Sequence, residues 1–285
     1  MEVAQRLVFL LVFVASSYGQ RIPQTLFEPI VVTQRQESRI QTLESVASMT
    51  QEQRVELAKL YAATGAYLKS FSLLEELSKE TPTAYECQFL LGGISGILAT
   101  NESRVKSLPY VRTMKAAFET AAFINPDALD LQRIMLELYT ELPWVLGGSN
   151  KKAAESVKNI KSLSVVEGFL ASGYFNQMNN KNKEALVSYL NAISEVQDCS
   201  EFEGTTNNAH YRLAVLAYYL QKDIPKAQCL FERYLENHST GDSYPKSFAE
   251  YYLALLSDPA LFDEHMQEIL TTYDSLTAWI QNNFK

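Results

Sequence analysis

Glycine and proline are scarce in this sequence. It contains 11 glycines and 9 prolines among 285 residues, below the usual shares of about 7% and about 5%. Since these two residues most often interrupt regular structure, their scarcity favours helices. Hydrophobic residues make up 47% of the chain and charged residues 20%. This composition excludes a disordered tail and allows one or two folded domains.

Excess positive charge is also absent. The formal net charge is −8, which excludes a general binder of nucleic-acid phosphates. The three cysteines, Cys87, Cys199 and Cys229, are too few for a disulfide framework and supply one pair at most. Cys199 with Cys229 is the preferred pair, but three buried and unpaired thiols are slightly favoured over any bond.

No apolar run reaches the roughly 20 residues that span a bilayer. The short run Leu7–Ala15 follows Arg6 and precedes small residues at the −3 and −1 positions of a cleavage site. This pattern predicts a secretory signal peptide over residues 1–19, cleaved before Gln20. We therefore expect an exported protein, periplasmic or secreted, with no membrane insertion after cleavage.

Helical signals dominate the rest of the chain. Thr50 and Gln53 form a capping box, in which each side chain bonds the other residue's free amide at a helix start. Gly65 interrupts this helix. A second helix is expected to end before Pro82, because the residue preceding a proline is disfavoured in helices. The result is a helix-turn-helix unit of about 34 residues.

Three helix-turn-helix units, which contain Gln51, Val166 and Tyr211 in their first helices, share one spacing of small and bulky residues. Bulky residues would fill the space between paired helices, and small ones would stand where the helices cross closely. Ala214 lies one place early, which predicts a turn one residue shorter in the third unit. Second helices alone match over residues 115–126 and 150–162, with an insert around residues 100–108 ahead of the former. The small residues that carry the pattern are Ala58, Ser70, Gly173, Ala185, Ala192 and Ala227.

On these residues the chain resembles the tetratricopeptide repeat (TPR) family over residues 50–240. The resemblance implies an all-α fold, an α-α superhelix that forms a TPR-like solenoid of about five stacked helix pairs. We expect an N-terminal capping segment over residues 20–49 and C-terminal capping helices over residues 241–285. The stretch Leu142–Ala153 is also similar to an insert in exported bacterial TPR proteins, among them the TPR partner subunits of periplasmic TRAP-type transporters.

No pattern for catalysis or for a cofactor is present. Residues 147–152 combine glycines and lysines, but the spacing of a phosphate-binding loop fails, and Ser149 is expected to cap a helix instead. The histidines His210, His238 and His265 match no metal-ligand motif, and no nucleophile motif occurs. The sequence therefore predicts neither an enzyme nor a bound metal or cofactor.

Five residues are candidates for contact with a partner. In a TPR superhelix, set positions of each first helix line the concave surface, and the resemblance assigns Lys59, Tyr174, Gln177 and Arg212 to it. A solvated groove without a ligand is an equal expectation for each of them. Trp144 is the fifth candidate, because loops carry function more often than helices. For Trp144, packing is favoured over exposure, since a tryptophan buries a large apolar area.

These features favour a non-catalytic scaffold that binds a protein or peptide partner in its concave groove. The alternative is an accessory subunit of a TRAP-type solute transporter, binding a small ligand or a solute-binding protein. An enclosed pocket near Trp144 would favour that alternative. An enzyme built on helical repeats is a third hypothesis. A homo-oligomer is left open, as is a eukaryotic secreted protein with glycans at Asn101 or Asn237.

Overall fold

The computed structural model describes residues 30–199, 205–221, 223–239 and 242–284. The predicted signal peptide over residues 1–19 and its cleavage before Gln20 lie outside these residues. Among the described residues, no helix combines the length and the apolar character needed to cross a bilayer.

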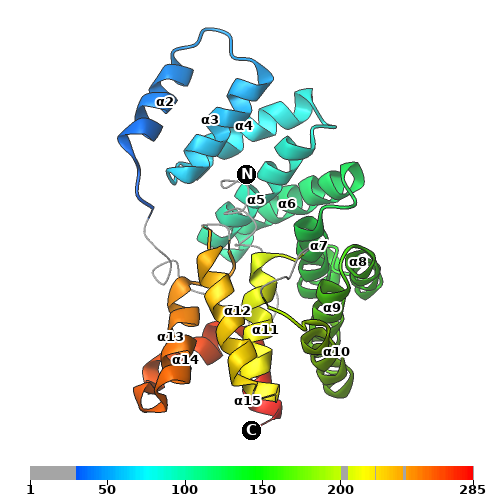
Figure 1. Cartoon of the computed structure of the whole chain (residues 1–285). Helices are drawn as coiled ribbons and strands as arrows, with labels where there is room; N and C mark the ends of the chain where they lie inside the picture. Colours follow the sequence, from blue (N-terminus) through cyan, green and yellow to red (C-terminus); the bar gives the residue numbers. More distant parts are fainter. Residues whose placement is uncertain (1–29, 200–204, 222, 240–241, 285) are drawn as a thin grey trace.

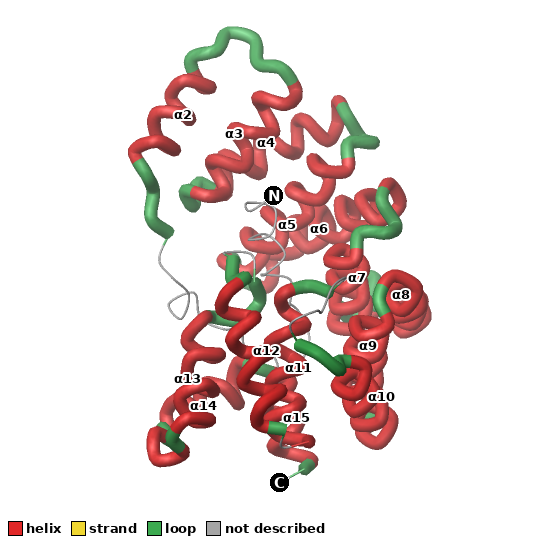
Figure 2. Tube along the Cα trace, in the orientation of Figure 1, coloured by secondary structure: helices red, strands yellow, loops and turns green. Residues whose placement is uncertain are grey.

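Every regular element in the described ranges is a helix, so the all-α class is confirmed (Figure 2). The part of the chain that the structure describes also contains three short 3-10 or π segments: η3 (Trp144–Leu146), η4 (Ala217–Gln221) and η5 (Pro259–Leu261). The α-helices are α2 (Gln34–Glu44), α3 (Gln51–Ala63), α4 (Tyr67–Glu80), α5 (Tyr85–Asn101), α6 (Arg104–Ile124), α7 (Leu129–Glu141), α8 (Asn150–Leu163), α9 (Val165–Met178), α10 (Asn182–Glu195), α11 (Asn207–Leu216), α12 (Ile224–Glu236), α13 (Lys246–Ser257), α14 (Glu264–Tyr273) and α15 (Ser275–Asn283).

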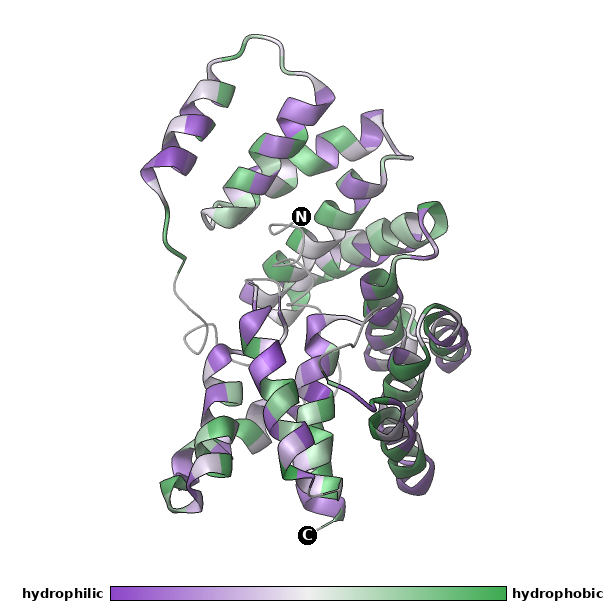
Figure 3. Ribbon diagram, in the orientation of Figure 1, coloured by the Kyte–Doolittle hydropathy of each residue, from purple (hydrophilic) through white to green (hydrophobic). Residues whose placement is uncertain are grey.

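From α2 to α13, each helix packs against the next one along the chain. Figure 1 shows this order as a path that runs from α2–α4 at one end to α11–α15 at the other. Many of the helices have a hydrophobic side and a hydrophilic side (Figure 3). A helix with one apolar face must bury that face against neighbours, so stacked pairs build a core that no single pair could form.

The first helix pair has the predicted caps and crossing. The Thr50 side chain accepts from Gln53 N, and Gln53 returns a bond to the Thr50 backbone, which confirms the capping box. Gly65 adopts a left-handed φ of 79° in the turn. Ser70 Oγ donates to the Ala58 carbonyl at 2.8 Å, and both residues are fully buried. The small residues therefore lie where α3 and α4 cross.

The α9–α10 pair crosses even more closely. A Cβ atom placed on Gly173 would lie 2.3 Å from Cε1 of Tyr189, and real contacts of this kind are never that short. Ala185 and Ala192 are fully buried on the facing helix. Glycine at this position is required because the Tyr189 ring occupies the space of any side chain.

The turn of the third unit is shorter, as predicted, but its small residues lie farther apart: Ala214 and Ala227 are 13 positions apart, whereas Gly173 and Ala185 are 12 apart. Two residues separate Gln221 from Ile224, whereas three separate Met178 from Asn182. The end of its first helix is wound as the π segment η4. A π segment fits an extra residue into the helix, which explains how Ala214 and Ala227 are both fully buried.

One predicted insert is itself helical. We expected an insert around residues 100–108 ahead of the helix over residues 115–126, but α5 extends to Asn101 and α6 already begins at Arg104. Pro109 lies inside α6. Pro109 is the sixth residue of α6 and lies beyond the first-turn amides that lack a partner within the helix, so it removes one backbone hydrogen bond, to the Val105 carbonyl.

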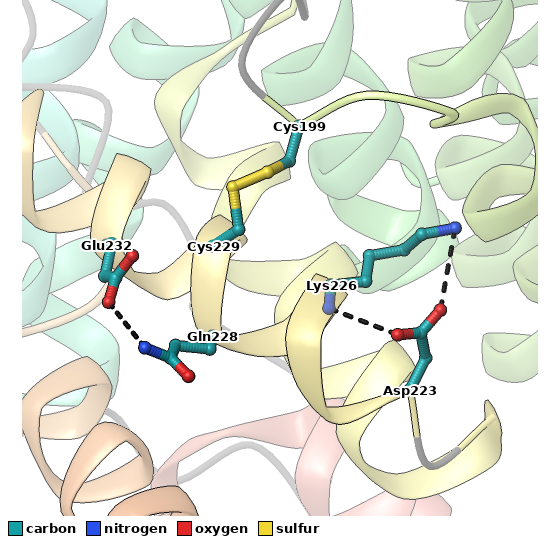
Figure 4. Close-up of a disulfide and its surroundings, with 6 residues drawn as sticks. All are labelled: Cys199, Asp223, Lys226, Gln228, Cys229 and Glu232. Carbon is teal, nitrogen blue, oxygen red and sulfur yellow. Dashed lines mark hydrogen bonds and ion pairs between the residues drawn. A yellow bond between two sulfur atoms is a disulfide. The ribbon is translucent and has the colours of Figure 1, made fainter.

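A disulfide joins Cys199 to Cys229 (Figure 4), while Cys87 is buried and free. The expectation of three unpaired thiols is therefore wrong for this pair. The fold brings the start of the α10–α11 connection against α12, and this places the two Cα atoms 6.3 Å apart. That distance lies within the usual range for a disulfide.

Replacing both bonded cysteines with serine is expected to lower the free energy of unfolding by about 3 kcal/mol, because the bond closes a loop of about 30 residues in the unfolded chain. Urea denaturation of the Cys199→Ser/Cys229→Ser variant measures this change. Cys87→Ser is the single-cysteine comparison. Equal stability of the double variant and the wild-type protein would contradict the prediction.

Candidate partner-binding site

Residues 143–149, named the Trp144 loop, form a tight structure between α7 and α8. The Pro143 carbonyl accepts from Leu146 N at 2.9 Å and from Gly148 N at 3.1 Å. Gly147 has a left-handed φ of 97°, a conformation that favours glycine. Ser149 N donates to the Tyr139 carbonyl at 2.8 Å. The loop backbone is therefore held in one conformation at both ends.

Trp144 points out of this loop and is 85% exposed, and its neighbour Val145 is 64% exposed. The expected packing of Trp144 is therefore wrong. Leu142 is buried and Leu146 packs against the core, so these two leucines supply the apolar contacts that hold the loop down. A large aromatic side chain is left free on a fixed backbone.

A charged cluster lies under the Trp144 loop. Glu119 of α6 accepts from Lys115 at 2.9 Å, from Lys152 at 2.8 Å and from the Tyr139 hydroxyl at 2.8 Å. A Cβ on Gly147 would lie 2.3 Å from Lys115 Cε, so the loop rests on this lysine. Ser149 caps α8 by accepting from Lys152 N, as predicted.

Hydrogen bonds in this cluster change the acidity of Glu119. Burial would raise the pKa of its carboxyl, but the bonds from Lys152, Lys115 and Tyr139 outweigh it and hold the pKa at about 2. The carboxylate therefore stays charged at neutral pH. We did not predict this cluster, although the spacing of Lys115 and Glu119, four residues apart on one helix, is a signal for such a pair.

Glu119→Gln is expected to make stability less sensitive to acid. The folded pKa of about 2 lies below the usual value of about 4.3. Stabilisation by Glu119 is therefore complete above about pH 5 and is lost as the pH falls toward 2. Between pH 7 and pH 3, the wild-type protein is expected to lose about 1 kcal/mol more of its unfolding free energy than Glu119→Gln does. The effect is this small because solvent screens the half-exposed Lys152. Urea denaturation at pH 7 and pH 3 measures it. An equal acid-induced loss in both proteins would contradict this.

Three other candidates, Tyr174, Gln177 and Arg212, meet inside the protein. They surround a cavity of about 10 Å³ between α9, α11 and the start of α15, which is room for about one water molecule. The Tyr189 hydroxyl donates to Gln177 Oε1 at 2.7 Å, and Gln177 Nε2 donates to the Ser275 carbonyl at 3.3 Å. These three side chains do not line an open groove in this structure, because the C-terminal helices cover them.

Arg212 links two helices at this place. Its Nε donates to the Tyr244 hydroxyl at 3.1 Å, and its Nη2 donates to Glu137 Oε1 at 3.2 Å. Burial would lower the pKa of Arg212, but Tyr244 and Glu137 outweigh it and raise the pKa. Tyr174 donates to Glu141, and burial raises the pKa of its hydroxyl well above the usual value. These groups are engaged within the fold.

Arg133, Glu167 and Thr206 form an interior polar cluster that we did not predict as a unit. Arg133 Nη1 donates to Thr206 Oγ1 at 2.8 Å, and Arg133 Nε lies 3.7 Å from Glu167 Oε2. Thr206 donates to Glu167 Oε1 through its hydroxyl at 2.6 Å and its amide at 2.9 Å. Only 1% of Glu167 is exposed. The cluster ties α7, α9 and the start of α11 together.

Lys59 lies apart from the other candidates. Its ammonium group pairs with Glu86, which links α3 to α5. The lysine side chain is 23% exposed and the glutamate 53% exposed. Lys59 is accessible from solvent, but its charge is already paired.

Within the described ranges, no group of three or more His, Cys, Asp or Glu side chains is placed to hold a metal ion. Comparison of the chain with protein-family models finds no match, and no curated protein matches it either. The TPR resemblance therefore depends on the residues that carry it in this sequence.

Proposed function

We propose that this chain is an exported, non-catalytic helical scaffold of the TPR type that binds a protein partner. The observation that carries the proposal is Trp144, an 85% exposed tryptophan on a loop fixed by backbone hydrogen bonds. Tryptophan is among the residues most enriched at the energetic centres of protein interfaces. A side chain held on a fixed backbone loses little conformational freedom on binding, which favours affinity.

The primary contact is assigned to the Trp144 loop rather than to the predicted groove. Tyr174, Gln177 and Arg212 are bonded to neighbouring groups, so a partner would have to displace those groups to reach them. Lys59 can add a contact only by exchanging Glu86 for a carboxylate of the partner. A single-site anchor with a polar surround is the arrangement expected of a partner-binding module.

The transporter-subunit alternative gains no specific support. An enclosed pocket near Trp144 would favour it, but the cavity described above is lined from α9, α10, α11 and α15, together with Tyr244, and does not include Trp144. Its volume of about 10 Å³ is far below the several hundred Å³ of a typical small-molecule site.

Trp144→Ala is expected to weaken partner capture at least tenfold while leaving thermal stability unchanged, since the side chain contributes no core packing. The measurement is in-cell cross-linking of the tagged chain, with the captured proteins quantified by mass spectrometry. Leu68→Ala is the matched control, because Leu68 is 62% exposed on α4, away from the loop. Equal enrichment of the same partner by the wild type and by Trp144→Ala would overturn the proposal.

A further inference from the structure

A second exposed apolar loop lies between α13 and α14. Residues 258–264, named the acidic loop, present Leu261 at 54% exposure and Phe262 at 56% exposure. The loop is held in place at both sides. Asp258 accepts from Ala260 N at 2.9 Å, and the Tyr251 hydroxyl bonds both the carbonyl and the amide of Asp263. Like the Trp144 loop, it displays large apolar side chains on a fixed backbone.

The charge of the acidic loop is uniformly negative. It contains two aspartates and one glutamate and no basic residue. Asp258 and Asp263 cap η5 and α14 through backbone amides, so their charges are not cancelled by a cation. Glu264 is exposed. An apolar pair thus lies among three carboxylates.

The surface beside the Trp144 loop has the opposite charge. Helix α8 begins immediately after this loop and carries four exposed lysines against one exposed acid, Glu155. Lys152 and Lys115 both pair with the single carboxylate of Glu119, so these three side chains together have a net charge of about +1 at neutral pH. The lysines, named the α8 lysines, are Lys151, Lys152, Lys158 and Lys161. They form a local positive surface in a chain whose net charge is −8.

The two loops cannot meet within one molecule. Figure 1 shows α8 on one side of the protein and α13 with α14 on the opposite side. We propose that they meet between molecules, with the acidic loop of one copy docking on the Trp144 loop and α8 lysines of a second copy. This inference rests on the proposed function, because it names a second copy of this chain as a partner for the Trp144 loop.

The chemistry of the two surfaces matches in two respects. Leu261 and Phe262 would cover Trp144 and Val145, removing exposed apolar side chains from water on both copies. The carboxylates would lie near the α8 lysines, which speeds association and orients the copies. Since the two surfaces differ, the contact is head-to-tail, and it produces a closed ring or a growing chain of copies. High salt would weaken the contact because the charges lie at the surface.

Sedimentation velocity of the purified mature chain tests this inference. We expect the mass to rise with concentration, and the association constant to fall at least tenfold in Trp144→Ala, in Phe262→Ala and in Lys151→Glu/Lys158→Glu. Lys106→Glu, which changes an exposed lysine on α6, is the control that should associate like the wild type. Far-ultraviolet circular dichroism confirms that each variant is folded.

Mixing two of the variants gives the sharpest outcome. Trp144→Ala keeps an intact acidic loop, and Phe262→Ala keeps an intact Trp144 loop, so the mixture has one working interface. We expect a dimer of the two variants that grows no further. A wild-type chain that stays monomeric at about 1 mM, or association unchanged in all the variants, overturns the inference. If the monomeric chain still captures a different protein through Trp144, the proposed function stands and only the inference fails.

Discussion

Replacement of Tyr211 with alanine is expected to lower the free energy of unfolding by about 5 kcal/mol. Tyr211 is fully buried, and its ring stacks on Tyr244 with 4.0 Å between centroids. Its hydroxyl donates to Asp274 Oδ2 at 3.1 Å. Removing a buried aromatic ring costs about 3–5 kcal/mol. The buried Asp274 carboxylate would also lose a donor.

Urea denaturation measures this change, and Tyr211→Phe separates the ring from the hydroxyl. The phenylalanine variant keeps the packing and is expected to lose about 1–2 kcal/mol. Burial raises the pKa of Asp274, against the hydrogen bonds of Thr277, Leu276 and Tyr211. The charged form therefore opposes folding as the pH rises through the folded pKa, so Tyr211→Phe should cost more at pH 7 than at pH 4. A loss below 2 kcal/mol for Tyr211→Ala would contradict the assigned packing.

Arg133→Ala is expected to cost about 3–5 kcal/mol, because Glu167 would remain buried without a cation. Arg133 Nε lies 3.7 Å from Glu167 Oε2, and Arg133 also donates to Thr206. Arg39→Ala is the matched control. Arg39 pairs with Glu56 at 2.7 Å, but both side chains are more than 40% exposed, so its loss should cost under about 1 kcal/mol.

The double variant Arg133→Ala/Glu167→Gln tests the electrostatic explanation. The introduced glutamine side chain would be neutral, and its amide oxygen would still accept from Thr206. We therefore expect the double variant to recover at least half of the stability lost in Arg133→Ala. If the double variant is no more stable than Arg133→Ala, the loss comes from packing and not from an unpaired charge.

The helices and their close crossings were predictable because their causes are local. The Thr50–Gln53 box depends on residues three positions apart, and small residues at a fixed spacing allow two helices joined by a short turn to approach. Gly173 against Tyr189 is such a crossing within one hairpin. Local sequence is sufficient for these features because both partners lie within one hairpin.

The candidate site was only partly predictable. Trp144 was named from its loop, but its exposure depends on Leu142 and Leu146 taking the core contacts beneath it. Tyr174, Gln177 and Arg212 were expected on an open surface, but each is engaged within the fold instead. Tyr174 bonds Glu141, Gln177 bonds Ser275, and Arg212 bonds both Tyr244 and Glu137. Those partners lie far away in sequence, so no local pattern records them.

The sequence by itself determined the helical class, the caps at Thr50 and Ser149, and the close crossings of the α3–α4 and α9–α10 pairs. Only the tertiary structure decided that Cys199 bonds Cys229, that Arg133 and Glu167 share the interior, and that Trp144 stays outside. Pairs within a hairpin are fixed by periodicity and short turns. Contacts between residues far apart in the sequence depend on how the helices between them pack, because each crossing angle changes where the next helix lies.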